Sequence, residues 1–414
     1  MTKPPILSID AGTTGISVFA FDEAARIVHH TYKEFAQHYP QPGWVEHDAD
    51  EIWQVALRLV RETLDRVGSD SVAAIGLTNQ RETTVLWDRR TGKPVSRAIV
   101  WQCRRSESLC RAAIEAGHAD LVKQKTGLVI DPYFSATKIQ YLLRTNPELR
   151  ALARHGHLAF GTIDSWLLWN LTGGKVHATD LTNASRTLLL NIHERKWDEA
   201  LLDLFEVPPT LLPQVLPSVD AFGQTDAAIA GHPIPICGVA GDQQAALFGQ
   251  TGFKSNDAKV TYGTGAFLVV NCGERCPLSR SGLLTTLACG ANGLPVYALE
   301  GSVFVAGAAV QWLPTVSASS NPPPKRKRSP APCPTQAASS SCPHSLDWVH
   351  RIGTAPHAAP YSDSPAAPPA LTWFGRRLKA SLIRWPTCWT LCPPSKASPL
   401  ENFASTARLA RTIS

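Results

Sequence analysis

Asp242 is the side chain whose place in the sequence most directly indicates chemistry. It follows the short apolar run 236–241 and precedes an alanine-rich segment, which is the pattern of a strand that leads straight into a helix. A carboxylate at such a junction lies beside the unpaired amides of a helix start, where it can accept a proton from a bound hydroxyl. Asp is also a preferred helix N-cap, so this segment alone leaves a general base and a cap as alternatives.

A polar run at the end of another predicted strand indicates where a hydroxyl-rich substrate would bind. The apolar segment 72–77 leads into the polar run 78–83, which contains Arg81 and Glu82. Each hydroxyl of a polyol or sugar needs a hydrogen-bond partner, and such a run supplies several. The segments 98–105 and 131–138 add the aromatic side chains Trp101 and Tyr133. An exposed loop is the alternative interpretation of the polar run.

Two turns rich in glycine and threonine indicate phosphate binding. The first contains Thr13 and Thr14 and joins the predicted strands 6–10 and 16–21. Glycine lets backbone amides approach a ligand, and threonine hydroxyls can donate to phosphate oxygens. A second such turn, 262–265, lies between the predicted strands 259–261 and 266–270. Two hairpins of one kind favour a duplicated fold that holds one polyphosphate between two lobes, whereas each turn alone is compatible with a hairpin that binds nothing.

The elements that must position these side chains include three predicted helices. Residues 51–67 have an apolar face at helical spacing. Trp166 and Trp169 are typical of a helix packed in a core, and a further helix is expected over Gly301–Leu313. Gly307 would let another group pack close to the backbone of that last helix.

Length and composition bound the class of protein. A chain of 414 residues exceeds one typical core, so we expect two domains. No segment is apolar over the length that spans a membrane and the N-terminus lacks a signal-peptide core, which predicts a cytoplasmic location. The net charge of +6 comes largely from the segment after Leu313, whose acids are Asp347, Asp363 and Glu401. This uneven charge gives no reason to expect a nucleic-acid partner.

These segments belong to a longer series of motifs in a fixed order along the chain. The series is Asp10-Ala-Gly-Thr-Thr14, Pro42-Gly-Trp-Val-Glu-His-Asp48, Thr78-Asn-Gln-Arg-Glu-Thr-Thr84, Trp101-Gln-Cys-Arg-Arg105, Asp131-Pro-Tyr-Phe-Ser135, Gly241-Asp-Gln-Gln-Ala-Ala246 and Tyr262-Gly-Thr-Gly265. Through Leu313 the chain thereby closely resembles glycerol kinases, a branch of the FGGY carbohydrate kinase family. The resemblance implies an α/β fold of the ribonuclease H-like (actin/hexokinase) type with two lobes, the second of which is incomplete here.

The resemblance also implies roles at a glycerol site. Asp242 would be the base that takes the proton of the terminal hydroxyl as it attacks the γ-phosphate of MgATP. The other glycerol-binding residues implied are Arg81, Glu82, Tyr133 and Gln243, with Trp101 packing on the carbons.

A nucleotide site for ATP is implied in the same way. Asp10 would lie near Mg²⁺, and the phosphates would be lined by Thr13, Thr14 and Thr264. Gly307 and Gln311 would lie near the nucleotide. No membrane span is implied, and assembly into a homo-oligomer is compatible with the family.

Two residues depart from the family pattern in the first phosphate hairpin. Ser17 stands where the family usually has Arg, and Ala11 replaces a usual Gln. An Arg at position 17 would supply a charge-assisted hydrogen bond to phosphate, so its loss should weaken nucleotide binding.

The composition changes abruptly at Pro314, where proline and serine runs begin together with the basic run 325–328. Taken in a shifted reading frame with free codon choice, Leu346–Thr354 yields Gly-Leu-Gly-Ala-Pro-Asp-Trp-Asp, which is similar to a glycerol kinase signature missing from the chain. Trp373–Ala380 and Pro314–Ser319 yield further family-like segments in the same frame. We therefore expect a single-base deletion, or an equivalent indel, near codon 314, either in the gene or in its sequencing record. A disordered tail is then expected in place of the second half of the ATP lobe.

The expected organisation is a glycerol-binding domain at 1–249, the start of an ATP-binding domain at 250–313, and the out-of-frame tail at 314–414. The expected activity is phosphorylation of glycerol to sn-glycerol 3-phosphate. Another FGGY kinase for a sugar or polyol is one alternative. A truncated remnant that binds a polyol without phosphorylating it is the other.

Overall fold

The computed structural model describes residues 3–262, 266–277, 279 and 282–303. These fall into two compact units. The first holds residues 3–259 together with the described part of Val269–Glu300, and the second is represented by residues 260–262, 266–268 and 301–303. The expected tail 314–414 lies outside the described residues, as do Thr264, Gly307 and Gln311. The side chains whose contacts are described below belong to the first unit.

A mixed five-stranded sheet forms the centre of the first unit. Its strand order is β14 (Ile236–Gly241), β5 (Ala74–Asn79), β1 (Ile6–Ala11), β2 (Gly15–Phe21) and β3 (Ile27–Glu34). Strands β1, β2 and β3 form an antiparallel meander, whereas β5 and β14 run parallel to β1. The strands at 6–10 and 16–21 predicted from the sequence are confirmed as an antiparallel hairpin. The parallel pairs bring the carboxyl ends of β1, β5 and β14 to one edge of the sheet.

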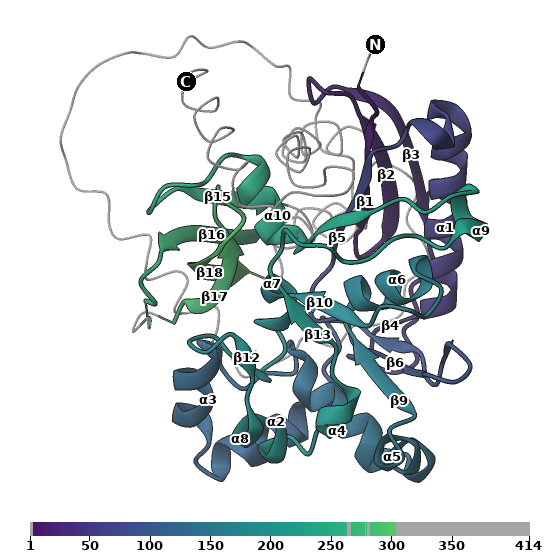
Figure 1. Ribbon diagram of the computed structural model, residues 1–414. Helices are drawn as coiled ribbons and strands as arrows, with labels where there is room; N and C mark the ends of the chain where they lie inside the picture. The colour runs from purple at the N-terminus through teal and green to yellow at the C-terminus, as the bar shows by residue number, and fades with distance from the viewer. Residues whose placement is uncertain (1–2, 263–265, 278, 280–281, 304–414) are drawn as a thin grey trace, which may run out of the picture. The chain divides into compact units, whose positions relative to one another are not determined.

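Helix α1 (Ala49–Val67) covers this sheet, lying along β2 and β3 (Figure 1). The prediction of a helix at 51–67 is confirmed, with a start two residues earlier because Asp48 caps the helix by accepting from the amides of Asp50 and Glu51. Helix α6 (Ile163–Leu171) packs against α1, and its Trp166 is fully buried in the same apolar core. Trp166 is thus core, as the sequence predicted, and its indole donates to the carbonyl oxygen of Ala49.

A group of helices forms a second apolar core in the lower part of Figure 1. They are α2 (Glu107–Glu115), α3 (Ala119–Thr126), α4 (Ser135–Thr145), α5 (Pro147–Arg154) and α8 (Glu199–Leu204). Tyr133 and Phe134 lie just before α4 and belong to this core. This packing fixes the direction from which Tyr133 reaches the edge of the central sheet.

A four-stranded sheet has the order β15 (Ala258–Tyr262), β16 (Ala266–Gly273), β18 (Pro295–Val303) and β17 (Leu284–Cys289). The helix predicted to begin at Gly301 is wrong for its first three residues, since Gly301–Val303 complete strand β18. The physical reason is strand pairing, because β18 lies between β16 and β17 in the sheet and its antiparallel ladder with β17 extends to the Glu300–Leu284 pair.

The remaining elements are short and connect these layers. They are β4 (Glu46–His47), β6 (Val85–Asp88), β7 (Lys93–Pro94), β8 (Ala98–Ile99), β9 (Leu158–Gly161), β10 (Ala178–Asp180), α7 (Leu181–Ala184), β11 (Leu190–Asn191), β12 (Lys196–Trp197), β13 (Gln214–Leu216), α9 (Ala227–Ala230), α10 (Asp242–Gly249) and the 3-10 turns Ser69–Ser71 and Pro209–Leu211. None of the helices in the described ranges has the length and hydrophobicity needed to cross a bilayer.

Candidate active site

The candidate site lies where three strands of the central sheet end side by side. In the strand register, Asn79 at the end of β5 pairs with both Ala11 of β1 and Gly241 of β14. The next residues of each strand therefore leave the sheet at one edge. Arg81 and Glu82 leave from β5, and Asp242 leaves from β14, as the sequence pattern predicted.

Asp242 is the first residue of α10, and Gly241 is the N-cap. The capping alternative is therefore wrong for Asp242. Its Oδ1 accepts from the backbone N–H of Gln243 at 2.8 Å, and its Oδ2 accepts from the Gln243 Nε2 at 3.1 Å. The side chain is 35% exposed, so the carboxylate is held by its contacts with Gln243 and is still open to a ligand. These are the two properties that a general base for a bound hydroxyl requires.

Arg81 is the centre of the polar contacts at this edge. Its Nε lies 3.5 Å from the Asp242 Oδ1, its Nη2 donates to the Tyr133 hydroxyl at 3.3 Å, and its Nη1 donates to the Gln244 Oε1 at 3.2 Å. Gly241 makes room for this side chain, because a Cβ at position 241 would lie 2.7 Å from both Cγ and Cδ of Arg81. Position 241 must therefore be glycine for the Arg81 side chain, which comes from the end of β5, to keep this position.

Glu82 is fully buried beside Arg81 and has a left-handed backbone with φ of +61°. Its carbonyl oxygen accepts from the Ser135 hydroxyl and from the Lys138 ammonium, both at 3.1 Å. These two bonds from the start of α4 hold the unusual backbone in place. Burial raises the pKa of the Glu82 carboxyl, and the cations Arg81 and Arg186 oppose that effect.

The aromatic candidates Trp101 and Tyr133 lie edge to face, with ring centroids 5.7 Å apart. Trp101 is half-buried, and its Nε1 donates to the Thr13 Oγ1 at 3.1 Å. Burial, followed by the charge of Glu82, raises the pKa of the Tyr133 phenol far above its ordinary value, so this hydroxyl is a neutral donor and acceptor. The structure therefore brings the first Gly/Thr hairpin into direct contact with the predicted polyol residues.

A chain of side-chain contacts strengthens this connection. Gln37 donates to the carbonyl oxygen of Thr13 at 3.0 Å and is hydrogen-bonded to His47 at 2.7 Å. Burial lowers the pKa of His47 to about 3, so the ring is neutral. The other ring nitrogen of His47 lies 3.4 Å from Gln80, which also donates to the carbonyl oxygen of Gly12 at 3.0 Å. The turn 12–14 is thus held by hydrogen bonds from Gln37 and from Gln80, the residue that precedes Arg81.

Asp10 places a second carboxylate near Asp242. Burial, followed by the charge of Asp242, raises the pKa of Asp10 to about 7. Two carboxylates that repel each other thus lie near the threonine-rich hairpin, and carboxylate oxygens are of the hard kind that Mg²⁺ prefers. In the part of the chain that the structure describes, no group of three or more His, Cys, Asp or Glu side chains could hold a metal ion.

Four residues at this site were not predicted from the sequence. Glu300 on β18 accepts from both terminal nitrogens of Arg81, at 2.6 and 2.9 Å. Arg186 binds Glu82 and Glu300, Gln244 binds Arg81, and Lys259 donates to the Gln243 Oε1. Gln244 stands in the same motif as Asp242 and Arg186 ends a polar loop, whereas Glu300 and Lys259 lie in otherwise apolar strands and give no comparable signal.

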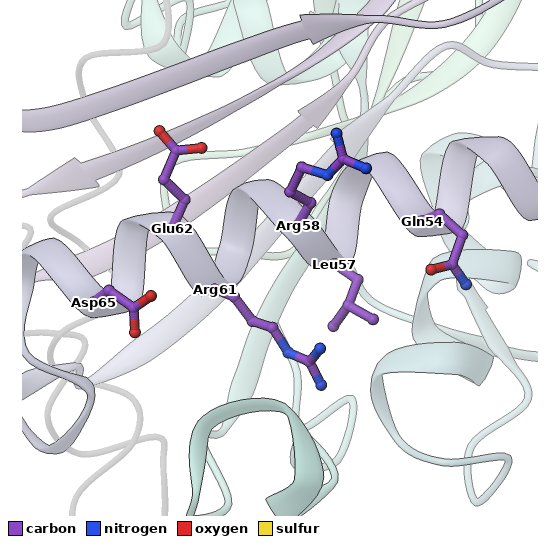
Figure 2. Close-up of a pocket in the computed structure, with 6 residues that line it drawn as sticks. All are labelled: Gln54, Leu57, Arg58, Arg61, Glu62 and Asp65. Atoms are coloured by element: carbon purple, nitrogen blue, oxygen red, sulfur yellow. The ribbon is translucent and has the colours of Figure 1, made fainter.

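A hollow on the surface lies away from these residues. It is lined by side chains of α1, namely Gln54, Leu57, Arg58, Arg61, Glu62 and Asp65 (Figure 2). These side chains leave the helix in different directions and do not converge on a point. None of the predicted site residues lines it, so the candidate active site is the sheet edge.

Comparisons with known proteins show the family to which the chain belongs. The model of the FGGY family of carbohydrate kinases, N-terminal domain, matches residues 5–249. The chain belongs to the FGGY family of carbohydrate kinases.

Similar proteins named glycerol kinase are found in several bacteria. The chain is 56% identical to the glycerol kinase of Symbiobacterium thermophilum over 315 residues, which cover 76% of this chain and 63% of the relative. It is 53% identical to glycerol kinase 2 of Thermotoga maritima over 310 residues, or 74% of this chain and 62% of the relative. The chain therefore spans less than two thirds of the length of these relatives.

Solved structures give the same picture. The glycerol kinase of Plasmodium falciparum, crystallised with ADP, superposes with a TM-score of 0.72 at 40% identity and covers 76% of this chain and 63% of that protein. A xylulose kinase from Lactobacillus acidophilus superposes with a TM-score of 0.67 at 20% identity, over 74% of this chain and 61% of that protein. The second match shows the shared fold alone. Together these neighbours confirm the predicted α/β fold of sugar kinases.

Proposed function

We propose that the protein is a glycerol kinase, which transfers the γ-phosphate of ATP to a terminal hydroxyl of glycerol and gives sn-glycerol 3-phosphate and ADP. The observation that carries the proposal is the meeting of Arg81, Tyr133 and Asp242 at one strand edge, beside a threonine-rich hairpin. The relatives at 53–56% identity support glycerol as the substrate over a larger sugar.

In this proposal the polar side chains hold the three-carbon substrate. Arg81, Glu82, Tyr133 and Gln243 offer hydrogen-bond partners for its hydroxyls, and the half-buried indole of Trp101 supplies an apolar surface for its carbons. The rigid contacts among Arg81, Tyr133 and Asp242 would fix the terminal hydroxyl next to the base, which is the main way that a kinase accelerates transfer.

Asp242 would accept the hydroxyl proton as the substrate oxygen forms its bond to the γ-phosphorus. The bond from that phosphorus to the β-phosphate oxygen breaks, and ADP leaves with the electron pair. Thr13 and Thr14 would line the phosphates from the first hairpin, with Thr264, Gly307 and Gln311 expected on the nucleotide side. Mg²⁺ fits the carboxylate of Asp10, and when bound it would supply neutralisation of phosphate charge.

The domain limits 1–249, 250–313 and 314–414 remain part of the proposal, as does a cytoplasmic location. The second candidate function is a remnant that binds glycerol and transfers no phosphate. One observation favours it: the matches to the relatives extend over 310–315 residues, which is about the length of the chain before its composition changes near Leu313.

The test is a coupled assay of ADP release with the purified chain and with the product of a gene in which one base is inserted near codon 314. Substrates are glycerol, a ketopentose and a pentitol. The proposal expects turnover with glycerol for the frame-restored product and little for the sugars. Preferred turnover of a sugar would instead assign another FGGY activity, and glycerol binding without turnover in both products would assign the remnant.

A further inference from the structure

Two of the proposed glycerol-binding residues, Arg81 and Glu82, form a closed ring of four charged side chains with Arg186 and Glu300, which we call the four-charge ring. Each residue is at most 3% exposed. Glu300 accepts from Arg81 at 2.6 and 2.9 Å and from the Arg186 Nη2 at 2.9 Å. The Arg186 Nε donates to the Glu82 Oε1 at 2.6 Å, and that oxygen lies 3.8 Å from the Arg81 Nε, which closes the ring.

The signs alternate around the ring, so its two positive and two negative charges cancel. A single buried charge without partners is very unfavourable, whereas alternating neighbours compensate one another. Burial opposes ionisation of Glu300, but Arg186 and Arg81 outweigh it and hold the pKa of its carboxyl at about 2. Glu300 therefore stays ionised throughout the physiological pH range.

The ring determines which edge of Arg81 remains available to a ligand. Glu300 engages both terminal nitrogens of the guanidinium, which turns the Nε edge toward Asp242 at 3.5 Å. Arg186 acts on Glu82 in the same way, because its Nε binds one carboxylate oxygen directly. Arg81 and Glu82 have proposed contacts with glycerol. They are held by Glu300 and Arg186, respectively, for which no glycerol contact is proposed.

Arg186 also has a feature that a purely structural ion pair lacks. Its Nη1 is buried and has no hydrogen-bond partner among the residues that the structure describes. Buried donors in a region shaped for stability alone are nearly always satisfied. The unsatisfied donor indicates that Arg186 is kept for the orientation of Glu82 and Glu300 at some cost in stability.

We propose that Glu300 and Arg186 are positioning residues, which hold Arg81 and Glu82 in the orientation that binds glycerol. The inference rests on the proposed function for the identity of the ligand. Glu300 orients the guanidinium of Arg81, and Arg186 orients the carboxylate of Glu82. The three segments involved are far apart in sequence, so the site is completed only when β18 pairs in its sheet.

The test compares glycerol affinity, measured by calorimetry on the full chain, in Glu300→Gln, Arg186→Lys and the double variant. Each single variant should bind glycerol at least tenfold more weakly at an equal folded fraction. Because the two residues are coupled, the double variant should lose less binding free energy than the sum of the losses in the two single variants. The matched control is Asp198→Asn, another buried carboxylate, which accepts from Lys125 and Asn191 away from the site and should leave the affinity unchanged.

A second readout is independent of glycerol. Because Glu300 holds both terminal nitrogens of Arg81, their NMR signals should be separately resolved in the unmodified chain and should merge in Glu300→Gln, with Arg81→Lys used for assignment. Unchanged affinity in the folded single variants, or signals that stay resolved without Glu300, would overturn the positioning role and leave the proposed function intact. If the unmodified chain binds no glycerol, the proposed function fails, and the Arg81 signals still decide the role of Glu300.

Discussion

Asp10 and Ser17 stand directly opposite each other across the β1–β2 ladder. Side chains at opposed positions of an antiparallel pair lie on one face of the sheet, about 5 Å apart at Cβ. An arginine at position 17, as the family usually has, would therefore reach both Asp10 and a phosphate bound at the hairpin. In this chain Ser17 leaves Asp10 with a pKa of about 7, raised by burial and by Asp242.

The variant Ser17→Arg should strengthen nucleotide binding. The added guanidinium supplies a charge-assisted hydrogen bond to phosphate, for which we expect about a tenfold gain in ADP affinity. It should also lower the pKa of Asp10. Calorimetry with ADP and a carboxyl NMR titration measure the two effects, and Ser17→Gln serves as a neutral control of similar length. Equal ADP affinity in both variants would exclude a phosphate contact from position 17.

The raised pKa of Asp10 predicts a pH dependence of stability. Between the ordinary pKa of 3.8 and the folded value of about 7, the folded chain retains a proton that the unfolded chain releases. The free energy of unfolding should therefore fall as the pH rises through this window. Asp10→Asn removes that contribution, so urea unfolding should show a flatter pH profile for the variant.

Asp164 provides the comparison for this experiment. Burial, followed by the charge of Asp180, raises the pKa of Asp164 to about 6. This shift makes the free energy of unfolding fall with pH both in the unmodified chain and in Asp10→Asn. The slope that remains in Asp10→Asn should therefore be smaller still in the double variant with Asp164→Asn. An unchanged slope in Asp10→Asn would mean that Asp10 is ionised across the window.

Gly241→Ala should disable glycerol binding by displacing Arg81. The φ of −60° at Gly241 suits alanine, so the expected effect comes from the 2.7 Å approach of the new Cβ to the arginine stem. Gly161→Ala is the matched control, because its Cβ would meet the Ser165 Cβ at 2.4 Å outside the site. Both variants should lose stability, by about 1–3 kcal/mol, and only Gly241→Ala should lose affinity for glycerol. Equal affinities in the two folded variants would contradict the role assigned to Arg81.

Asp242→Asn should separate chemistry from binding. Asparagine keeps an oxygen that can accept from the Gln243 amide but cannot take up the hydroxyl proton. In the frame-restored product we expect turnover to fall by about 10²–10⁴-fold with glycerol affinity nearly unchanged. The coupled ADP assay and calorimetry measure the two quantities, and retained turnover would remove Asp242 as the base.

The sequence predicted the strand edge and the residues that leave it, because each follows an apolar run. Asp242 after β14 and Arg81 after β5 are local signals of this kind, and the parallel pairing of the two strands brings them together. The capping alternative for Asp242 could not be excluded from the sequence, because the exact helix start decides it and depends on Gly241 as N-cap.

Glu300 could not be predicted in the same way. It lies 219 residues from Arg81 within an apolar strand, so its isolated charge resembles an exposed position on a β-strand. Only the pairing of β17 with β18 and the burial of that face show that it meets two arginines. The expected helix at Gly301 was wrong at its first residues for a related reason, since strand pairing across the sheet overrides a local helical pattern.

The most direct test of the account is a calorimetric titration of the purified chain with glycerol, alongside Arg81→Ala. The account predicts one glycerol site in the chain and none in the variant, with Asp198→Asn binding as the unmodified chain does. A folded chain that takes up no glycerol, or an Arg81→Ala variant that binds it equally well, would contradict a glycerol site at this edge of the sheet.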